Sequence, residues 1–147
     1  MMKKFLLLIL IVSFNISSAE QAITQWVYNT LERAQANLDK GNLEAAERIY
    51  YDYANDTWSS RSYDHFVILR TYAYFLISYD RNEEALKYLR QASLKRDMPP
   101  YDIFELNFTL GQVYYVNGDR ENAKKTLLKW VAIGEKNDLD LKPEGYA

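Results

Sequence analysis

The chain has 147 residues, of which 13 are tyrosine and none is cysteine. Its formal net charge of −2 argues against nucleic acid as a partner, because nucleic acid is bound by a basic face. Without cysteine there are no disulfides, so packing alone has to hold the fold together.

The first nineteen residues have the layout of a secretory signal peptide. Two lysines are followed by a mainly apolar run over 5–14, and small residues precede a cleavage point after Ala19. The rival interpretation is a membrane anchor, but the run is about half of the roughly 20 residues that span a bilayer. We therefore expect a bacterial export signal, a periplasmic location, and a mature chain of residues 20–147 with no membrane segment.

Six helices are predicted along the mature chain, followed by the start of a seventh. The apolar residues recur at three- and four-residue steps, which is typical of helices that bury one face. The predicted spans are 21–40, 43–55, 62–79, 82–95, 101–117 and 120–135.

The helices are expected to form pairs, because one short polar segment recurs three times. Each copy is a turn that leads into a helix with a small residue at a fixed offset. From Ala46 to Ala85 is 39 residues (85 − 46), and from Ala85 to Ala123 is 38 (123 − 85). Self-similarity at such a period indicates a repeat architecture. The three copies are 41–46, 80–85 and 118–123.

The turn in each pair begins with Gly41, Asp80 or Gly118, which are residue types that tolerate the left-handed backbone conformation. Asn42 and Asp119 follow and can cap the next helix. The first helix of each pair also carries a small residue, twelve positions before the small residue of the second helix. Two helices approach closely where both side chains are small, which predicts the centre of each hairpin. The matched pairs are Ala34/Ala46, Ala73/Ala85 and Gly111/Ala123.

These residues resemble the tetratricopeptide repeat family, and the third pair fits its pattern best, through Leu110-Gly111, Tyr114 and Leu127. The first pair departs from the pattern, and each repeat is four or five residues longer than the usual period of about 34. The resemblance implies an all-α fold, an α-solenoid of three helix hairpins plus the start of a fourth, that binds protein. The expected repeats are about 22–60, 61–99 and 100–141, with 142–147 beginning a truncated fourth.

A narrower resemblance lies in residues 101–147. The runs 110–115 and 123–130 are similar to exported repeat proteins that accompany TonB–ExbB–ExbD systems of Gram-negative bacteria. This resemblance implies an accessory role in TonB-dependent uptake across the outer membrane, with components of the TonB system as partners.

Two other roles stay open: a self-associating structural protein and a periplasmic scaffold for envelope assembly. Repeat arrays require a polar capping helix, and none follows the third pair. Either the sequence is a fragment, or its C-terminal face meets a partner or a second copy. In the second case we expect a homo-oligomer that depends on Leu127 and Trp130.

Stacked hairpins form a superhelix whose concave surface is lined by the first helix of each pair. Tyrosine and arginine are favoured as binding anchors, whereas the apolar candidates are equally well explained as core between repeats. We predict that Arg70, Tyr74, Gln112 and Tyr115 grip an extended or helical segment of a partner. The full set of candidates is Tyr28, Leu31, Gln35, Arg70, Tyr74, Ile77, Phe108, Gln112 and Tyr115.

The sequence predicts neither a catalytic nor a metal site. His65 is the only histidine, and without cysteine it has no obvious co-ligand, so a packing or surface role is expected. Asp138 and Asp140 lack the glycine and glutamate of a calcium loop and indicate a solvated turn. Phosphate loops, nucleophile elbows and zinc-binding helix motifs are absent from the sequence. We expect a binding protein without a cofactor, and no enzyme.

Overall fold

The computed structural model describes residues 22–56 and 62–141, which contain six α-helices and no strand. The predicted signal peptide and the predicted start of a fourth repeat lie outside the described residues. Within the described ranges, no helix combines the length and the apolar character needed to cross a bilayer. The helices are α1 (Gln25–Asp39), α2 (Leu43–Asn55), α3 (Ser62–Ser78), α4 (Asn82–Ser93), α5 (Pro100–Val116) and α6 (Arg120–Asn137).

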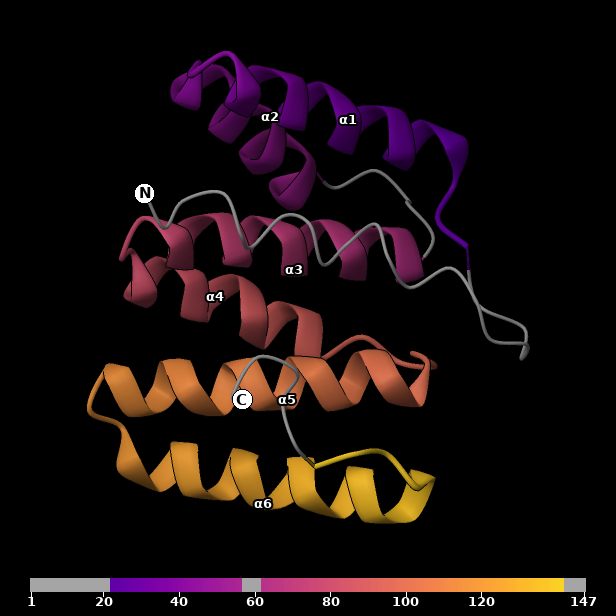
Figure 1. Cartoon of the computed structure of the whole chain (residues 1–147), viewed down its shortest axis with the longest axis vertical. Helices are drawn as coiled ribbons and strands as arrows, with labels where there is room; N and C mark the ends of the chain where they lie inside the picture. The colour runs from indigo at the N-terminus through magenta and orange to yellow at the C-terminus, as the bar shows by residue number, and fades with distance from the viewer. Residues whose placement is uncertain (1–21, 57–61, 142–147) are drawn as a thin grey trace.

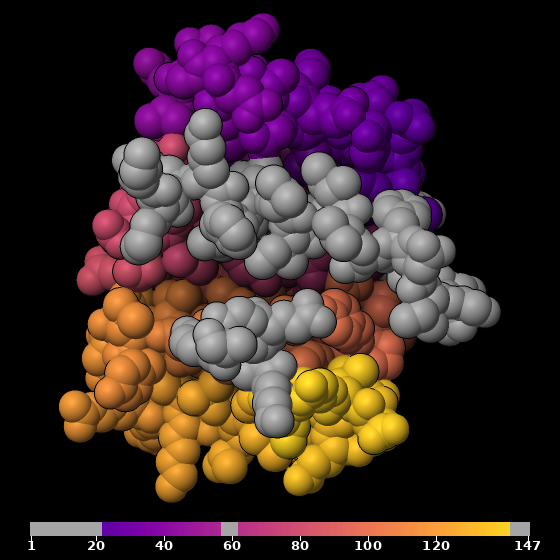
Figure 2. Space-filling view, in the orientation of Figure 1, coloured from indigo at the N-terminus to yellow at the C-terminus, as the bar shows by residue number. Residues whose placement is uncertain are grey.

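The helices pack as three successive hairpins, α1–α2, α3–α4 and α5–α6 (Figure 1). Each hairpin packs on the next through α2 with α3 and through α4 with α5. Figure 2 shows the same order on the surface, where the colour changes steadily from the first hairpin at one end to the third at the other. The predicted all-α solenoid of helix hairpins is therefore confirmed.

The turns inside the hairpins have the predicted backbone. Gly41, Asp80 and Gly118 have φ angles of 76°, 59° and 81°, the left-handed region that ends a helix. One residue later, Asp119 caps α6 by accepting a hydrogen bond from the Asn122 backbone N–H at 3.0 Å. The prediction for Asn42 is wrong, because its side chain makes no capping hydrogen bond.

Each of these turns is closed by the same backbone hydrogen bond. The N–H of the residue after the left-handed one donates to a carbonyl five residues earlier, which satisfies an otherwise unpaired carbonyl at the helix end. The three bonds are Asn42 to Asn37 at 2.8 Å, Arg81 to Leu76 at 3.0 Å and Asp119 to Tyr114 at 2.9 Å.

The predicted small residues lie at the hairpin centres, where all six are buried. Gly111 shows why the side chain has to be small. A Cβ atom built on Gly111 would lie 2.6 Å from Cδ2 of Leu127 on α6, well inside van der Waals contact. The third hairpin therefore packs with the Leu127 side chain against the backbone of α5.

Three helix ends differ by two residues or more from the predicted spans. Helix α4 ends at Ser93, two residues before the predicted end, and the other two are the start of α1 and the end of α6. Helix α1 begins at Gln25 rather than at residue 21, because Thr24 is extended and its side chain accepts a hydrogen bond from the Val27 N–H. Helix α6 continues to Asn137, two residues beyond the prediction, and ends where Asp138 adopts the left-handed conformation with φ of 53°. Apolar periodicity reports neither the left-handed conformation that ends α6 nor the hydrogen bonds of Thr24 that fix the start of α1.

Aromatic side chains fill the seam between the first two hairpins. Tyr50 on α2, Tyr72 and Phe75 on α3 and Tyr88 on α4 are all buried. The Tyr72 ring centroid lies 4.6 Å from that of Tyr88 and 6.0 Å from that of Tyr50. Burial raises the pKa of Tyr50 to about 12, because an ionised phenol would lose its hydration there. These tyrosines are core residues.

Candidate protein-binding surface

The nine sequence-predicted binding candidates lie on the first helix of each hairpin, three on each of α1, α3 and α5. We call this set of nine residues the first-helix surface. Its members differ widely in exposure and in the contacts they already make. The α1 members are Tyr28, Leu31 and Gln35, the α3 members are Arg70, Tyr74 and Ile77, and the α5 members are Phe108, Gln112 and Tyr115.

Two tyrosines of the first-helix surface are well exposed. Tyr28 on α1 is 47% exposed and Tyr115 on α5 is 64% exposed. The Tyr28 hydroxyl donates to Oε1 of Glu32 at 2.7 Å, and this hydrogen bond raises the pKa of the Tyr28 phenol. A large apolar ring with one polar tip suits protein contact, and these two side chains are accessible for it.

Arg70 is held in an ion pair that joins the second hairpin to the third. Its Nη1 lies 2.7 Å from Oδ1 of Asp102 at the start of α5, and both side chains are 12% exposed. Burial opposes the charge of the guanidinium, but Tyr74 and Asp102 outweigh it and raise the pKa of Arg70. The Tyr63 hydroxyl also donates to Asp102, to Oδ2 at 3.0 Å. Arg70 is thus a structural residue of the junction between the second and third hairpins.

The same junction recurs between the first and second hairpins. Asp64, in the first turn of α3, accepts hydrogen bonds from the Thr24 backbone N–H and hydroxyl, both at 3.0 Å. Asp64 and Asp102 are both buried and stand 38 residues apart (102 − 64). Neither aspartate is predicted from the sequence to join two hairpins. A signal for both aspartates is present in the sequence, because a Tyr-Asp dipeptide recurs at the repeat spacing. The two copies are Tyr63-Asp64 and Tyr101-Asp102.

Other members of the first-helix surface already have partners in the fold. The Tyr74 hydroxyl lies 3.4 Å from the hydroxyl of Thr109 on α5. The Gln35 amide nitrogen donates to Asp39 at 2.7 Å, while its oxygen is buried without a hydrogen bond among the described residues. Leu31 and Ile77 are partly buried against the core. The packing of Leu31 and Ile77 supports the alternative that the apolar candidates are core residues between repeats.

The third hairpin also has an aromatic core of its own. Phe104 and Phe108 on α5 pack against Trp130 on α6, with ring centroids 5.3 Å and 4.9 Å apart. Leu127 and Trp130, on which a homo-oligomer was predicted to depend, are therefore partly buried within this hairpin. The exposed large apolar residue on α6 is Leu128, at 60%.

His65 occupies a packing position. Its Nε2 lies 3.0 Å from the Ala54 carbonyl oxygen, and its Nδ1 lies 2.8 Å from Nζ of Lys95. Asp138 ends α6 in the left-handed conformation. Among the described residues, no group of three or more His, Cys, Asp or Glu side chains is placed to hold a metal ion.

Comparison with known proteins gives one distant similarity. The chain is 29% identical over 118 residues to Pre-mRNA-splicing factor 6 of Saccharomyces cerevisiae. That match covers 73% of this chain but only 11% of the yeast protein, so the chain spans about a tenth of the length of this curated relative. No family model matches the chain, and no solved structure matches it significantly. The stacked helix hairpins are compatible with the resemblance to tetratricopeptide repeats.

Proposed function

We propose that this chain is an exported protein-interaction module of the tetratricopeptide type, which binds a segment of a partner protein on its first-helix surface. The observation that carries the proposal is the stack of three hairpins, whose first helices expose Tyr28 and Tyr115. Repeat folds of this kind offer an extended binding surface. The proposed activity is binding, without catalysis and without a cofactor.

The partner that we propose is a component of a TonB–ExbB–ExbD system, in which the chain would be an accessory of TonB-dependent uptake. This part of the proposal rests on the resemblance of residues 110–115 and 123–130 to exported repeat proteins of such systems. The excess of acidic over basic residues in the chain agrees with a protein partner better than with nucleic acid.

Binding is tested with the purified chain and the periplasmic domains of TonB and ExbD, by titration calorimetry. We expect replacement of both Tyr28 and Tyr115 by alanine to weaken binding about 30-fold or more, the effect of losing a hot-spot contact of about 2 kcal/mol. Both side chains are exposed, so the melting temperature should not change. Arg70→Ala is unsuitable for this purpose, because it would break the junction with Asp102.

The matched control is Tyr51→Ala, which removes a 51% exposed tyrosine from α2, outside the first-helix surface. It should bind as the unmodified chain does. If neither TonB-system domain binds, the proposed partner is wrong. If a partner binds and the Tyr28→Ala/Tyr115→Ala variant retains full affinity, the first-helix surface is wrong.

Export is tested separately, by expressing the whole chain in a Gram-negative host and determining the N-terminus of the recovered protein. We expect it to begin at Glu20 and to appear in the periplasmic fraction, because small residues precede the predicted cleavage point after Ala19. Recovery of a chain that still begins at Met1 in the cytoplasmic fraction would overturn the periplasmic location.

A further inference from the structure

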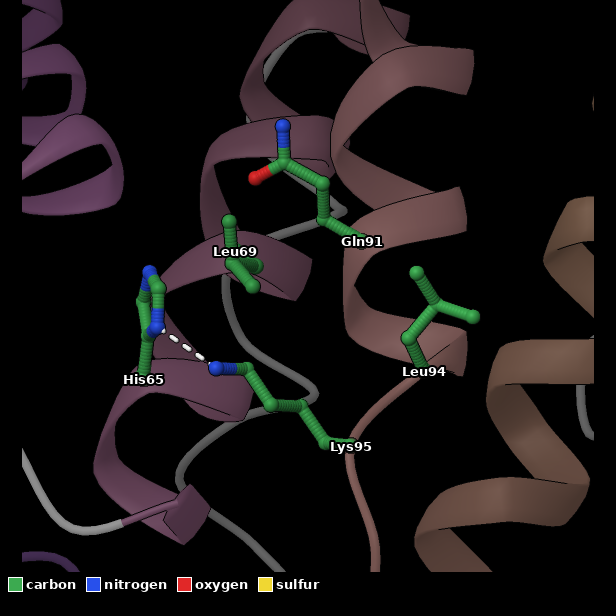
Figure 3. Close-up of a pocket in the computed structure, with 5 residues that line it drawn as sticks. All are labelled: His65, Leu69, Gln91, Leu94 and Lys95. Carbon is green, nitrogen blue, oxygen red and sulfur yellow. Dashed lines mark hydrogen bonds between the residues drawn. The ribbon is translucent and has the colours of Figure 1, made fainter.

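A small pocket lies at the seam between α3 and α4 in the middle hairpin (Figure 3). Its volume is about 250 Å³. Pockets that enclose small molecules usually measure about 300–1,000 Å³, so this one lies just below that range and has room for a side chain. It is lined by His65, Leu69, Gln91, Leu94 and Lys95.

The ammonium of Lys95 is held by a ring nitrogen of His65. The His65 Nε2 lies 3.0 Å from the Ala54 carbonyl oxygen, which can only accept, so Nε2 carries the proton. The other ring nitrogen, Nδ1, is then the acceptor for the Lys95 ammonium at 2.8 Å (Figure 3). The main chain of Lys95 is fixed as well, because its N–H donates to the Ala92 carbonyl at 3.0 Å.

The ammonium of Lys95 has no anionic partner among the described residues, whose ion pairs involve Arg70 and Arg81 instead. Partial burial removes some hydration from the Lys95 ammonium and so lowers its pKa. One of its three N–H groups is directed at His65, which leaves two that can donate to a bound acceptor. A partly desolvated cation of this kind is stabilised by an anion that brings hydrogen-bond acceptors.

The polar pair of His65 and Lys95 is specific to the middle hairpin. In the third hairpin the equivalent positions, 38 residues further on (103 − 65 and 133 − 95), are Ile103 and Ile133. Both isoleucines are partly buried. Packing at this seam therefore needs no histidine or lysine, and the pair in the middle hairpin calls for a different explanation.

We propose that this pocket binds an acidic side chain of a partner polypeptide, whose carboxylate accepts hydrogen bonds from Lys95. Leu94 is 79% exposed at the edge of the pocket and offers apolar contact to the stem of that side chain and to its neighbours, whereas Leu69 is fully buried beneath them. Lys95 is the one cation among the five lining residues, which suits a single carboxylate better than a phosphate that demands several donors.

The pocket does not depend on the proposed first-helix surface. Gln91 belongs to α4, and Leu94 and Lys95 directly follow that helix. The other two lining residues, His65 and Leu69, lie on α3 but are not members of the first-helix surface. No residue is shared between the two sets. The experiment below therefore uses no TonB-system protein, and its failure leaves the function proposed above untouched.

The test is an NMR titration of the isotope-labelled chain with three probes: acetyl-Leu-Glu-Leu-amide, acetyl-Leu-Gln-Leu-amide and sodium acetate. We expect the glutamate peptide to shift the signals of His65, Leu94 and Lys95 with millimolar affinity. The glutamine peptide should bind about ten-fold more weakly, because a neutral amide loses the charge-assisted hydrogen bond. Lys95→Met should abolish the difference, and Lys125→Met, which removes an exposed lysine of α6, should preserve it.

Three results would overturn the proposal. The first is that the pocket signals do not shift with the glutamate peptide. The second is equal binding of the glutamate and glutamine peptides, or binding of the glutamate peptide that Lys95→Met leaves unchanged. The third is that acetate binds as tightly as the glutamate peptide, which would mean that the pocket adsorbs small carboxylates and that Leu94 adds no contact with a polypeptide.

Discussion

Replacing Asp102 with alanine is expected to lower the free energy of unfolding by about 3–5 kcal/mol, the usual cost of removing one partner from a buried ion pair. Asp102 is buried, with 8% of the whole residue exposed, and accepts hydrogen bonds from Arg70 at 2.7 Å and from Tyr63 at 3.0 Å. Without the carboxylate, the guanidinium of Arg70 remains buried between α3 and α5 with its charge uncompensated. Small domains are stable by only about 5–15 kcal/mol, so this loss is a large share of the total.

The measurement is urea denaturation followed by circular dichroism. The control is Asp52→Ala, which removes an exposed aspartate from α2 and should change stability by less than about 0.5 kcal/mol. The double variant Arg70→Met/Asp102→Leu should recover most of the loss, because apolar residues of similar volume can replace a buried pair. An Asp102→Ala variant that loses less than about 1 kcal/mol would contradict a buried, mutually dependent pair.

The junction also shows where sequence reasoning reached its limit. Arg70 was predicted to be a binding anchor because its register places it on a first helix, and the structure does place it there. Helical periodicity reports the face of a residue but not its partner, and the partner Asp102 lies 32 residues further along the chain. Sequence spacing alone could have suggested the junction only through the repeated Tyr-Asp dipeptides.

The hairpins themselves were predictable because their determinants are local. A left-handed turn at Gly41, Asp80 or Gly118 and a small residue on each helix specify how two neighbouring helices pack. The start of α1 was missed because it is specified by a distant contact, in which Thr24 binds Asp64 of the next hairpin. Local features therefore predicted the helix pairs, while features between hairpins had to come from the structure.

For the candidate sites, too, the sequence predicted what depends on local spacing and not what depends on contacts between distant residues. Tyr28 and Tyr115 were correctly placed on first helices by counting from the small residues, but their exposure could not be read from the count. The pocket was not predicted at all. His65 and Lys95 are 30 residues apart in the sequence, and they meet only because the turn after α4 directs Lys95 back toward α3.

Truncation of Tyr72 to alanine is expected to lower the free energy of unfolding by about 3–5 kcal/mol, as for other large aromatic residues in a core. The Tyr72 side chain is 2% exposed, and its ring contacts those of Tyr50 and Tyr88. These rings come from α2, α3 and α4, so the cavity would open where the first two hairpins meet. Urea denaturation measures the loss.

The control is Tyr72→Phe, which keeps the ring and removes only the hydroxyl that donates to Glu47 at 3.1 Å. It should cost about 1 kcal/mol, the usual net contribution of one hydrogen bond. Equal losses in the two variants would mean that the hydroxyl, and not the packing of the ring, stabilises this seam.

The Tyr72→Ala variant should also change how the chain unfolds. In a repeat array, stability is approximately the sum of the stabilities of the repeats and of their interfaces, and cooperativity depends on the interfaces. Weakening the interface between α2 and α3 should therefore let the first hairpin open before the others, with faster amide hydrogen exchange in α1 and α2 than in α5 and α6. Uniform acceleration over all six helices would show instead that the array remains one cooperative unit.

Because Tyr28 and Tyr115 lie on the first and third hairpins, a partner that needs both anchors should bind the Tyr72→Ala variant more weakly, although neither anchor is altered.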